Sequence, residues 1–213
     1  MNWGEKKPVF IARIFLFIIY FVGIIGISLP SLRDLFVPLT PYTLLISMLI
    51  LLAFHWKWDL RFIAAAVIIA LAGLGVEVLG VQTGLIFGGY SYGPVLGIKI
   101  GQVPLMIALN WILLIYCSYF IAGKVFKAAL LKMAMAAALM VALDVLMEPV
   151  AIDLNMWNWE VEIPPLQNYA AWFFISFLFA GFFHVMKVKI LNPLAGYLFL
   201  FLVMFFGILN LTI

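Results

Sequence analysis

The sequence predicts an all-α, polytopic membrane bundle of about seven transmembrane helices with its N-terminus in the cytoplasm. Three observations indicate this fold class: an apolar composition, seven long apolar segments, and an uneven distribution of positive charge. Of the 213 residues, 68% are hydrophobic and 10% are charged, whereas soluble domains are about 45–50% apolar and about 25% charged. A chain of this size cannot bury so much apolar surface away from water. The composition therefore excludes a soluble enzyme, a disordered chain and a nucleic-acid-binding domain.

Seven apolar segments approach the length of about 20 residues that a helix needs to cross a bilayer. Their approximate boundaries are 9–29, 40–56, 60 to just past 79, 103–122, 128–147, 169–186 and 191–213. We expect the fifth helix to end near Glu148, because Pro149 disfavours helical geometry in the residue before it. The segments together predict a single transmembrane helical domain over residues 1–213.

The positive charges predict the orientation. With seven spans, the N-terminus and the second, fourth and sixth loops lie on one side. That side carries ten of the twelve Lys and Arg residues: Lys6, Lys7, Arg13, Lys57, Arg61, Lys124, Lys127, Lys132, Lys187 and Lys189. The other side carries only Arg33 and Lys99. Since Lys and Arg mark the cytoplasmic side of a membrane protein, we expect a multi-pass protein of the inner or plasma membrane, with the C-terminus outside.

Two connections are long, and both are expected to face outward. Segment 80–104 is rich in glycine and aromatic residues, and segment 149–168 carries Trp157 and Trp159. Long ordered loops often carry function, so we expect these two to cover the outer mouth of the bundle. The glycines at four-residue intervals in segment 80–101 have two interpretations. Either backbone approaches a ligand there, or, as we favour, small residues let helices pack closely.

Four polar residues interrupt the apolar segments. Glu77 lies in the third, Asn110 in the fourth and Asp144 in the fifth, four residues before Glu148. An acid at mid-bilayer costs about 2.5–3.5 kcal/mol on insertion scales, so such side chains face the bundle interior. Asp144 and Glu148 share one helix face, about 6 Å apart along its axis. Counting from the helix ends places all four in the outer half of the membrane, which predicts one convergent polar site.

Several of these residues have a second interpretation. Glu77 and Asn110 alternatively form an interhelical hydrogen-bonded pair, and Glu148 alternatively lies in water. Asn168 is either a site residue or the N-cap of the sixth span. Tryptophan is common both at membrane interfaces and in apolar binding sites, so both roles remain open for Trp157 and Trp159 in segment 149–168. His55, which neighbours Trp56 and Trp58, is expected at the membrane interface.

Metal and thiol chemistry find little support in the sequence. Cys117 is the single cysteine, and we expect it only to pack. Pairs like Asp144-x-x-x-Glu148 bind magnesium diphosphate in membrane prenyltransferases, but here the outer side offers only Arg33 and Lys99 to neutralise a diphosphate. We therefore predict no metal site. Acids and aromatic rings without cations favour an uncharged, apolar substrate.

The chain resembles the multi-pass carotenoid biosynthesis family that includes carotenoid hydratases of the γ-carotene and bisanhydrobacterioruberin type. The residues that carry the resemblance are Glu77, Phe87-Gly88-x-Tyr90-x-Tyr92, Leu96-Gly97, Val103-Pro104, Trp111, Asp144-x-x-x-Glu148-Pro149-x-Ala151, Trp157-x-Trp159, Asn168 and Trp172. They cover under half of the chain. Before Asn168 the sequence has Ile163-Pro164-Pro165 where the family leads us to expect a glycine–proline step.

The resemblance implies addition of water to a terminal isoprenoid C=C bond of a carotenoid, which gives a tertiary alcohol without a redox cofactor. Carotenoid, water and the lipid bilayer are then the partners, and contact with other enzymes of the pathway is compatible with it. Asp144 is expected to donate the proton, with Glu77 or Glu148 handling water, and an exchange of these roles is the alternative. The expected substrate-binding residues are Tyr90, Tyr92, Asn110, Trp111, Trp157, Trp159, Asn168 and Trp172. Aromatic faces among them stabilise a carbocation.

Two other functions remain open at this point. A carotenoid cyclase begins with the same protonation and ends without adding water. A non-catalytic protein that binds or transports lipid or carotenoid uses the acids only as a proton relay. Transport predicts access from both faces of the membrane, whereas the cytoplasmic halves of the spans carry no comparable buried acids, which argues mildly against it.

Overall fold

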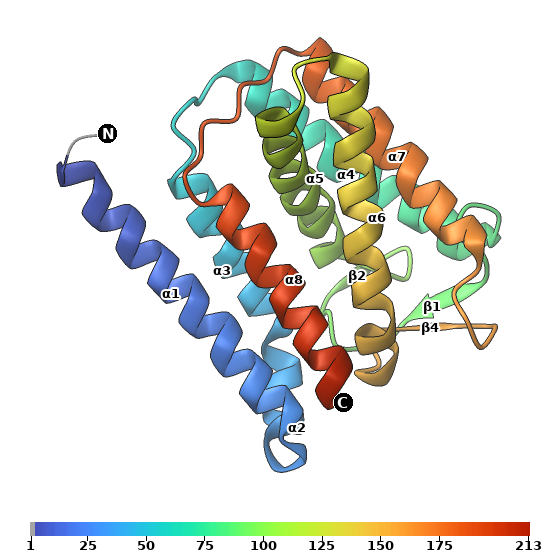
Figure 1. The fold of residues 1–213 in the computed structure, drawn as a ribbon. Coiled ribbons are helices and arrows are strands. Elements are labelled where there is room, and N and C mark those ends of the chain that lie inside the picture. The colour runs from blue at the N-terminus through green and yellow to red at the C-terminus, as the bar shows by residue number, and fades with distance from the viewer. Residues whose placement is uncertain (1–2) are drawn as a thin grey trace.

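Seven helical spans form the bundle in the computed structural model, which describes residues 3–213 (Figure 1). The helices are α1 (Trp3–Ser28), α2 (Pro30–Phe36), α3 (Thr40–Ala53), α4 (Leu60–Thr83), α5 (Leu105–Val125), α6 (Ala129–Asp153), α7 (Leu166–Val185) and α8 (Ala195–Thr212). A short 3-10 turn, Val37–Leu39, joins α2 to α3, so the two helices make one span over Pro30–Ala53. Each of the seven spans is long and apolar enough to cross a membrane. The prediction of a seven-span integral membrane protein is confirmed.

Sequence signals explain where several helices begin and end. Asp59 caps the N-terminus of α4, where its carboxylate accepts a hydrogen bond of 2.8 Å from the N–H of Phe62. Gly84 ends the same helix in the left-handed conformation, with φ of 66°, which glycine adopts at little cost. Pro104 and Pro165 directly precede α5 and α7. These residues confine α4, α5 and α7 to their spans.

The expected end of the fifth span is wrong. The helix α6 continues through Pro149 to Asp153, five residues beyond Glu148. Proline removes one N–H donor and crowds the preceding turn, and this cost is tolerated in membrane helices when neighbouring groups satisfy the backbone. Other boundaries also differ from the prediction. The first helix and the second span begin earlier, at Trp3 and Pro30, and α8 begins later, at Ala195.

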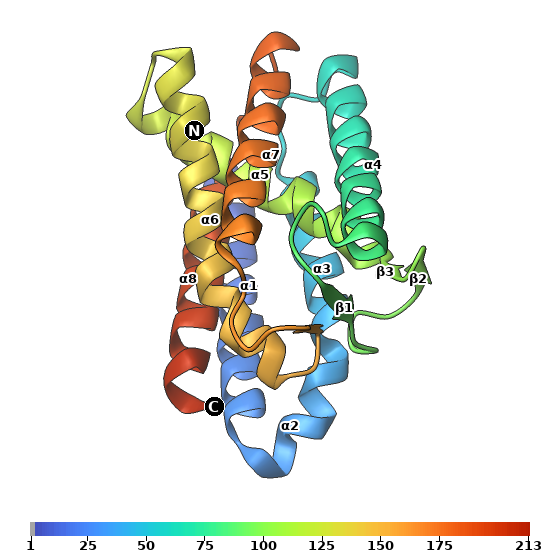
Figure 2. The ribbon, with the colours of Figure 1, turned by 90° about the vertical axis from the view of Figure 1, so that its right-hand side faces the viewer.

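The helix α5 lies at the centre of the bundle and contacts α3, α4, α6, α7 and α8. Its span has the largest buried share of the seven. The helix α1 lies at the edge of the molecule, where it packs against α8 (Figure 1). Turned by 90°, the molecule shows α6, α7 and α4 across one face, with part of α5 behind them (Figure 2). Large apolar side chains on the outward faces of the helices remain exposed, as expected for contact with lipid.

Two short antiparallel strand pairs lie at one end of the bundle. Strand β1 (Tyr90–Tyr92) pairs with β4 (Trp157–Trp159), and β2 (Lys99–Ile100) pairs with β3 (Val103–Pro104). The first pair joins the two long loops that the sequence places on the outer side (Figures 1 and 2). Apart from these strands the described chain is helical or irregular, in agreement with the predicted all-α class.

The helix-packing interpretation of the spaced glycines is wrong for most of them. The structure places Gly88, Gly97 and Gly101, like Gly84, in turns with positive φ. Gly80 does lie in α4, where the aromatic ring of Phe87 occupies the space that a side chain would need. The four-residue spacing thus reflects a folded loop rather than a helix–helix contact.

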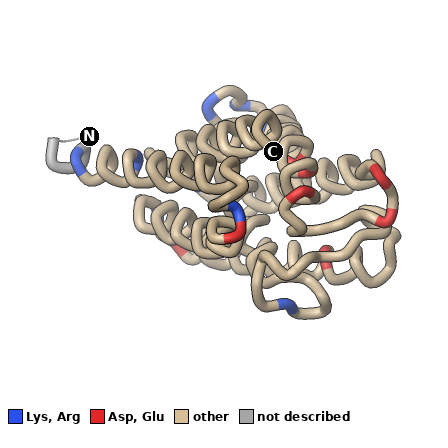
Figure 3. Tube along the Cα trace, turned by 90° about the horizontal axis from the view of Figure 1, so that it is seen from below, with Lys and Arg blue, Asp and Glu red and all other residues tan. Residues whose placement is uncertain are grey.

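Charged residues are unevenly distributed over the molecule. In Figure 3 most of the acidic positions lie in the half of the molecule that carries β1 and β4. The lysines of the α5–α6 and α7–α8 connections lie at the opposite end of the spans. The predicted cytoplasmic location of that end remains a prediction.

Candidate active site

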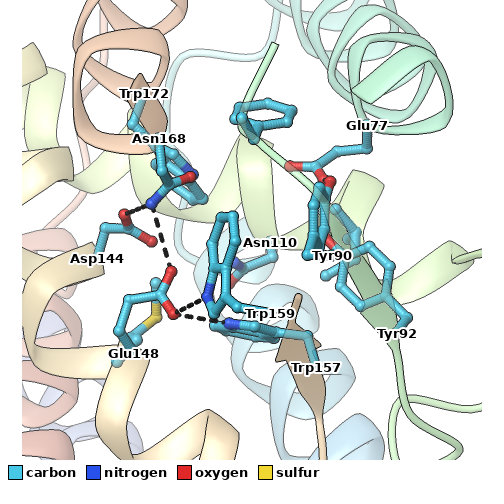
Figure 4. A pocket seen from close by; sticks show the side chains of 13 residues that line it. Glu77, Tyr90, Tyr92, Asn110, Asp144, Glu148, Trp157, Trp159, Asn168 and Trp172 are labelled. Carbon is cyan, nitrogen blue, oxygen red and sulfur yellow. Dashed lines mark hydrogen bonds between the residues drawn. The ribbon is translucent and has the colours of Figure 1, made fainter. Parts of the chain in front are cut away.

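A cavity opens between the ends of α4, α5, α6 and α7, beneath the β1–β4 strand pair (Figure 4). It encloses about 400 Å³ of space between the atoms, counted together with its open mouth. The residues that line it are Glu77, Phe87, Tyr90, Tyr92, Ile107, Asn110, Asp144, Met147, Glu148, Trp157, Trp159, Asn168 and Trp172. All three intramembrane acids thus face one cavity, and no Lys or Arg among residues 7–213 lines it.

Glu77 forms one wall, at 3% exposure. One of its carboxylate oxygens, Oε2, accepts hydrogen bonds from the hydroxyls of Tyr90 (2.5 Å) and Tyr92 (2.8 Å). The other oxygen accepts a bond of 3.1 Å from the indole N–H of Trp111. All three donors are neutral, so hydrogen bonds rather than a neighbouring cation offset part of the cost of ionising this buried carboxyl group.

Asp144 and Glu148 form the opposite wall on one face of α6 (Figure 4). Both side chains are buried, at 1% and 3% exposure. The side-chain N–H₂ of Asn168 bridges them, at 3.0 Å from Asp144 and 3.3 Å from Glu148. Glu148 also accepts hydrogen bonds of 2.9 Å from the indole N–H groups of Trp157 and Trp159. Within residues 3–213, Asp144 has no hydrogen-bond donor other than Asn168.

The strand pair β1–β4 positions four of these aromatic residues. In its register, Tyr90 lies opposite Trp159 and Tyr92 lies opposite Trp157, with Ser91 opposite Asn158 between them. Since side chains alternate along a strand, the four rings share the face toward the cavity, and the two polar residues point outward. One short ladder therefore carries four of the six hydrogen-bond donors to the two glutamates.

The phenols remain proton donors at physiological pH. Burial raises the pKa of both Tyr90 and Tyr92 above the ordinary value, and the neighbouring Glu77 carboxyl raises it further. Neither basic residue of this end lines the cavity: Arg33 pairs with Asp153 at 3.3 Å, and the Lys99 ammonium donates to the carbonyl of Tyr92. Among residues 3–213, no group of three or more His, Cys, Asp or Glu is arranged to hold a metal ion.

All but one of the predicted site residues line this cavity. The exception is Trp111, which is fully buried behind the wall, stacks on Trp172 with 4.3 Å between ring centroids, and bonds to Glu77. Sequence reasoning did not assign Phe87, Ile107 and Met147, which also line the cavity. Ile107 and Met147 give no signal in the sequence, because they resemble any other apolar residue of a span, whereas Phe87 lies in a loop and belongs to the residues that carry the family resemblance.

The structure decides most of the alternatives left open by the sequence. No hydrogen bond joins Glu77 to Asn110 within the described chain, and Glu148 is buried rather than in water. Asn168 lies inside the first turn of α7 and donates to the acids, while Pro165 occupies the N-cap. The prediction for His55 is wrong, since its ring is 2% exposed and hydrogen-bonded to the hydroxyl of Tyr116.

The cavity combines carboxyl groups with aromatic faces in an enclosed apolar setting. Carboxyl groups held near a substrate can donate and accept protons. Aromatic faces attract cations, through the negative charge of the ring face. The half-buried Asn110, at the start of α5, adds an amide to the lining. This arrangement suits a reaction in which an apolar substrate forms a positively charged intermediate.

Comparisons with known proteins point the same way. The model of a family described as "Carotenoid biosynthesis protein" matches residues 37–212. The chain is also 28% identical over 122 residues to a bisanhydrobacterioruberin hydratase of Haloarcula japonica. That match covers 54% of this chain and 42% of the relative, so it spans less than half of the relative's length. No solved structure matches the chain significantly. Since the family match extends over most of the sequence, the protein belongs to the carotenoid biosynthesis protein family.

Proposed function

We propose that the protein is a carotenoid hydratase, which adds water to a terminal isoprenoid C=C bond to give a tertiary alcohol. The observation that carries this proposal is the convergence of Glu77, Asp144 and Glu148 on one cavity walled by aromatic rings. Membership in a carotenoid biosynthesis family supports a carotenoid as substrate. The resemblance to a protein described as a hydratase supports the choice of reaction.

In the proposed reaction, Asp144 is the proton donor. Glu77 and Glu148 each accept three hydrogen bonds, which stabilise the ionised form of a carboxyl group. Asp144 accepts one, from Asn168. Of the three acids, Asp144 is therefore the least compensated as an anion and the best suited to carry the proton. The π electrons of the alkene take this proton at the less substituted carbon, and a tertiary carbocation forms.

The cavity stabilises the cation in two ways. The rings of Tyr90, Trp159 and Trp172 line the space and present faces or edges to it. The two glutamates add negative charge in a setting from which bulk water is largely excluded, where electrostatic attraction is stronger than in water. Because lysine and arginine are absent from the lining, no positive charge opposes the intermediate.

Water completes the reaction. Glu148 or Glu77 orients a water molecule that enters through the open mouth beneath β1–β4, and its oxygen bonds to the carbocation. The carboxylate accepts the proton that the water loses, and that proton returns to Asp144 for the next cycle. The sum is one water added to one double bond, with no electron transferred to or from a cofactor.

The test is expression in cells that accumulate a carotenoid with acyclic ends, followed by mass spectrometry of the pigments. The wild-type protein is expected to add the mass of one water for each modified end. Asp144→Asn and Glu77→Gln are expected to lower the hydroxylated fraction by about 100-fold or more, the usual scale of general acid–base catalysis. The control is Glu162→Gln, which makes the same chemical change at an exposed acid outside the cavity.

The same measurement separates the other functions. A product of unchanged mass with altered absorption and retention would identify a cyclase. Purified protein that retains carotenoid without changing it would identify a binding protein. Undiminished hydroxylation in both Asp144→Asn and Glu77→Gln would refute the assignment of these acids.

A further inference from the structure

A second concavity lies at the other end of the same helices. It opens between the C-terminal end of α5, the start of α6 and the connection to α8, and measures about 680 Å³ including its open mouth. The side chains of Lys124, Lys127, Lys132 and Lys189 line it. Lys124 is fourteen residues beyond Asn110 on α5, which places this concavity about 20 Å from the candidate active site. We call it the lysine pocket.

The four ammonium groups of the lysine pocket have no acidic counterpart among the side chains that the structure describes, those of residues 7–213. No Asp or Glu of this part of the chain lines the pocket. The one ion pair found among the same side chains joins Arg33 to Asp153, at the other end of the spans. Four like charges around one concavity repel one another, and an anion in their midst removes that repulsion. The pocket thus has the electrostatic character of an anion site.

Two of the lysines are held in place by aromatic rings. The ammonium of Lys132 lies 3.4 Å from the ring centroid of Tyr119, and that of Lys124 lies 5.1 Å from the ring centroid of Phe120. Gly123 leaves room for the side chain of Lys132 to pass over α5. A Cβ atom at position 123 would lie only 3.0 Å from the Cε of Lys132. Such contacts reduce the side-chain entropy that these lysines lose when an anion binds.

One wall of the pocket is apolar. Phe120 of α5 and Val188, Ile190 and Leu191 of the α7–α8 connection lie beside the lysines. A free inorganic anion has no apolar part that could contact this wall. An anionic lipid carries its charge directly beside acyl chains, so it matches both the lysines and the apolar wall. Basic pockets between transmembrane helices are known to take anionic headgroups.

We propose that the lysine pocket binds the phosphate headgroup of an anionic phospholipid, with the acyl chains lying along the apolar wall. The lysines approach the phosphate from α5, α6 and the two connecting segments, so the bound lipid ties these elements together. The site is separate from the acid-lined cavity and does not depend on the proposed reaction.

The experiment uses the purified full-length protein in a neutral detergent, with phosphatidylglycerol or phosphatidylcholine of identical acyl chains. Native mass spectrometry measures retained lipid, and thermal unfolding measures the shift of the midpoint temperature. Phosphatidylglycerol is expected to bind and to raise the midpoint, whereas phosphatidylcholine has a small effect. The double variant Lys127→Gln with Lys132→Gln is expected to bind phosphatidylglycerol about 30-fold more weakly, since each lysine near an anionic surface contributes about a fivefold factor.

The matched control is the double variant Lys57→Gln with Arg61→Gln. It removes the same charge at the same end of the bundle, from exposed positions outside the pocket, and is expected to bind like the wild type. If the first double variant does not fold, Lys124→Gln with Lys189→Gln replaces it, because both of these side chains are exposed.

Three results would overturn the proposal. Equal binding of the two lipids would show that charge is not recognised. Equal losses in the pocket variant and in the control would show a diffuse surface effect. An equal stabilisation by inorganic phosphate at the same concentration would identify a soluble anion rather than a lipid as the ligand.

Discussion

Neutral donors compensate the two glutamates of the cavity. Hydroxyl and N–H groups of tyrosine, tryptophan and asparagine supply every hydrogen bond to Glu77 and Glu148. A lysine or arginine would stabilise the same carboxylates more strongly, but it would also repel a positively charged intermediate. With neutral donors, the lining adds no positive charge of its own that would oppose a carbocation.

Removing the tyrosine hydroxyls tests this role. In the Tyr90→Phe and Tyr92→Phe variants, Glu77 loses one donor each, and a hydrogen bond to a charged group contributes about 1.5–3 kcal/mol. We expect each variant to reduce the hydroxylated product by roughly 10-fold to 100-fold, and the double variant to reduce it further. Pigment mass spectrometry at matched protein levels measures the effect.

The control for these variants is Tyr42→Phe, which removes an exposed hydroxyl far from the cavity in sequence and is expected to leave the product unchanged. If both cavity variants retain full conversion, the phenols do not support Glu77 during the reaction.

The acids were predictable from the sequence itself, whereas their donors were predicted only through the family resemblance, as substrate-binding residues and not as hydrogen-bond donors to the acids. Glu77 and Asp144 stand out because an ionisable side chain in an apolar span is costly and needs a reason to be there. Tyr90 and Trp157 lie in loops, where an aromatic residue is compatible with many roles. Only the pairing of β1 with β4, which joins segments 67 residues apart, brings them to the acids. No local pattern encodes that pairing.

At the level of elements, a buried polar clasp joins three parts of the bundle away from the cavity. His55, after α3, lies within 2.7 Å of the Tyr116 hydroxyl of α5, which also accepts a bond of 3.0 Å from Asn192 before α8. The other ring nitrogen of His55 lies 2.8 Å from the carbonyl of Lys57. Since a carbonyl only accepts, that nitrogen carries a proton, and in the neutral ring the other nitrogen accepts from the Tyr116 hydroxyl.

The clasp predicts a pH-dependent stability. Burial lowers the pKa of His55 below its ordinary value near 6.5, because desolvation disfavours the charged ring. The unfolded chain therefore binds the proton more readily than the native state as pH falls below about 6.5. Above that pH, the hydrogen bonds of neutral His55 contribute fully to the free energy of unfolding. This contribution is lost as the pH falls from the ordinary pKa toward the lower pKa of His55 in the native state. We expect the unfolding midpoint of the wild type to fall between pH 7 and pH 5 relative to that of a His55→Gln variant measured under the same conditions.

Two substitutions check the origin of this dependence. His55→Gln is expected to flatten the pH dependence and to lower stability at pH 7 by about 1–3 kcal/mol, the range for disrupting a buried hydrogen bond. His184→Gln, at an exposed position near the same end, is expected to change neither. An unaltered pH profile in His55→Gln would exclude the histidine as its source.

The elements themselves were well predicted, with instructive exceptions. Seven apolar segments define seven spans, because the bilayer requires length and apolarity from each helix. The continuation of α6 through Pro149 was not predicted. The proline rule holds for an isolated chain, whereas in the bundle the turn beyond Pro149 is buried, with Val150 and Ala151 at 1% and 0% exposure. The burial of His55 was missed for a similar reason, since its partners lie on α5 and before α8.

At the scale of the whole molecule, the two ends of the bundle differ in chemistry. One end holds the acid-lined cavity and the paired loops, and the other holds the lysine pocket and the clasp. The distribution of lysine and arginine predicts that the lysine-rich end faces the cytoplasm. The cavity then opens on the opposite side of the membrane.

Reporter fusions test this orientation. Alkaline phosphatase, which is active only outside the cytoplasm, is expected to be active when fused after Ile213 and inactive when fused after Lys127. A fluorescent protein that matures in the cytoplasm should give the opposite pattern. The reversed result at both positions would place the cavity mouth in the cytoplasm and would contradict the charge-based prediction.

The β1–β4 ladder has a consequence for how the protein tolerates change. Its four rings occupy alternate positions on two strands, so a slip of one residue in either strand would turn that strand's rings to the opposite face. One missing or added residue between Gly84 and Tyr90, or between Asp153 and Trp157, would therefore strip donors from a glutamate while leaving every span intact. In this protein, loop length is a stricter requirement than the identity of most residues that face the lipid.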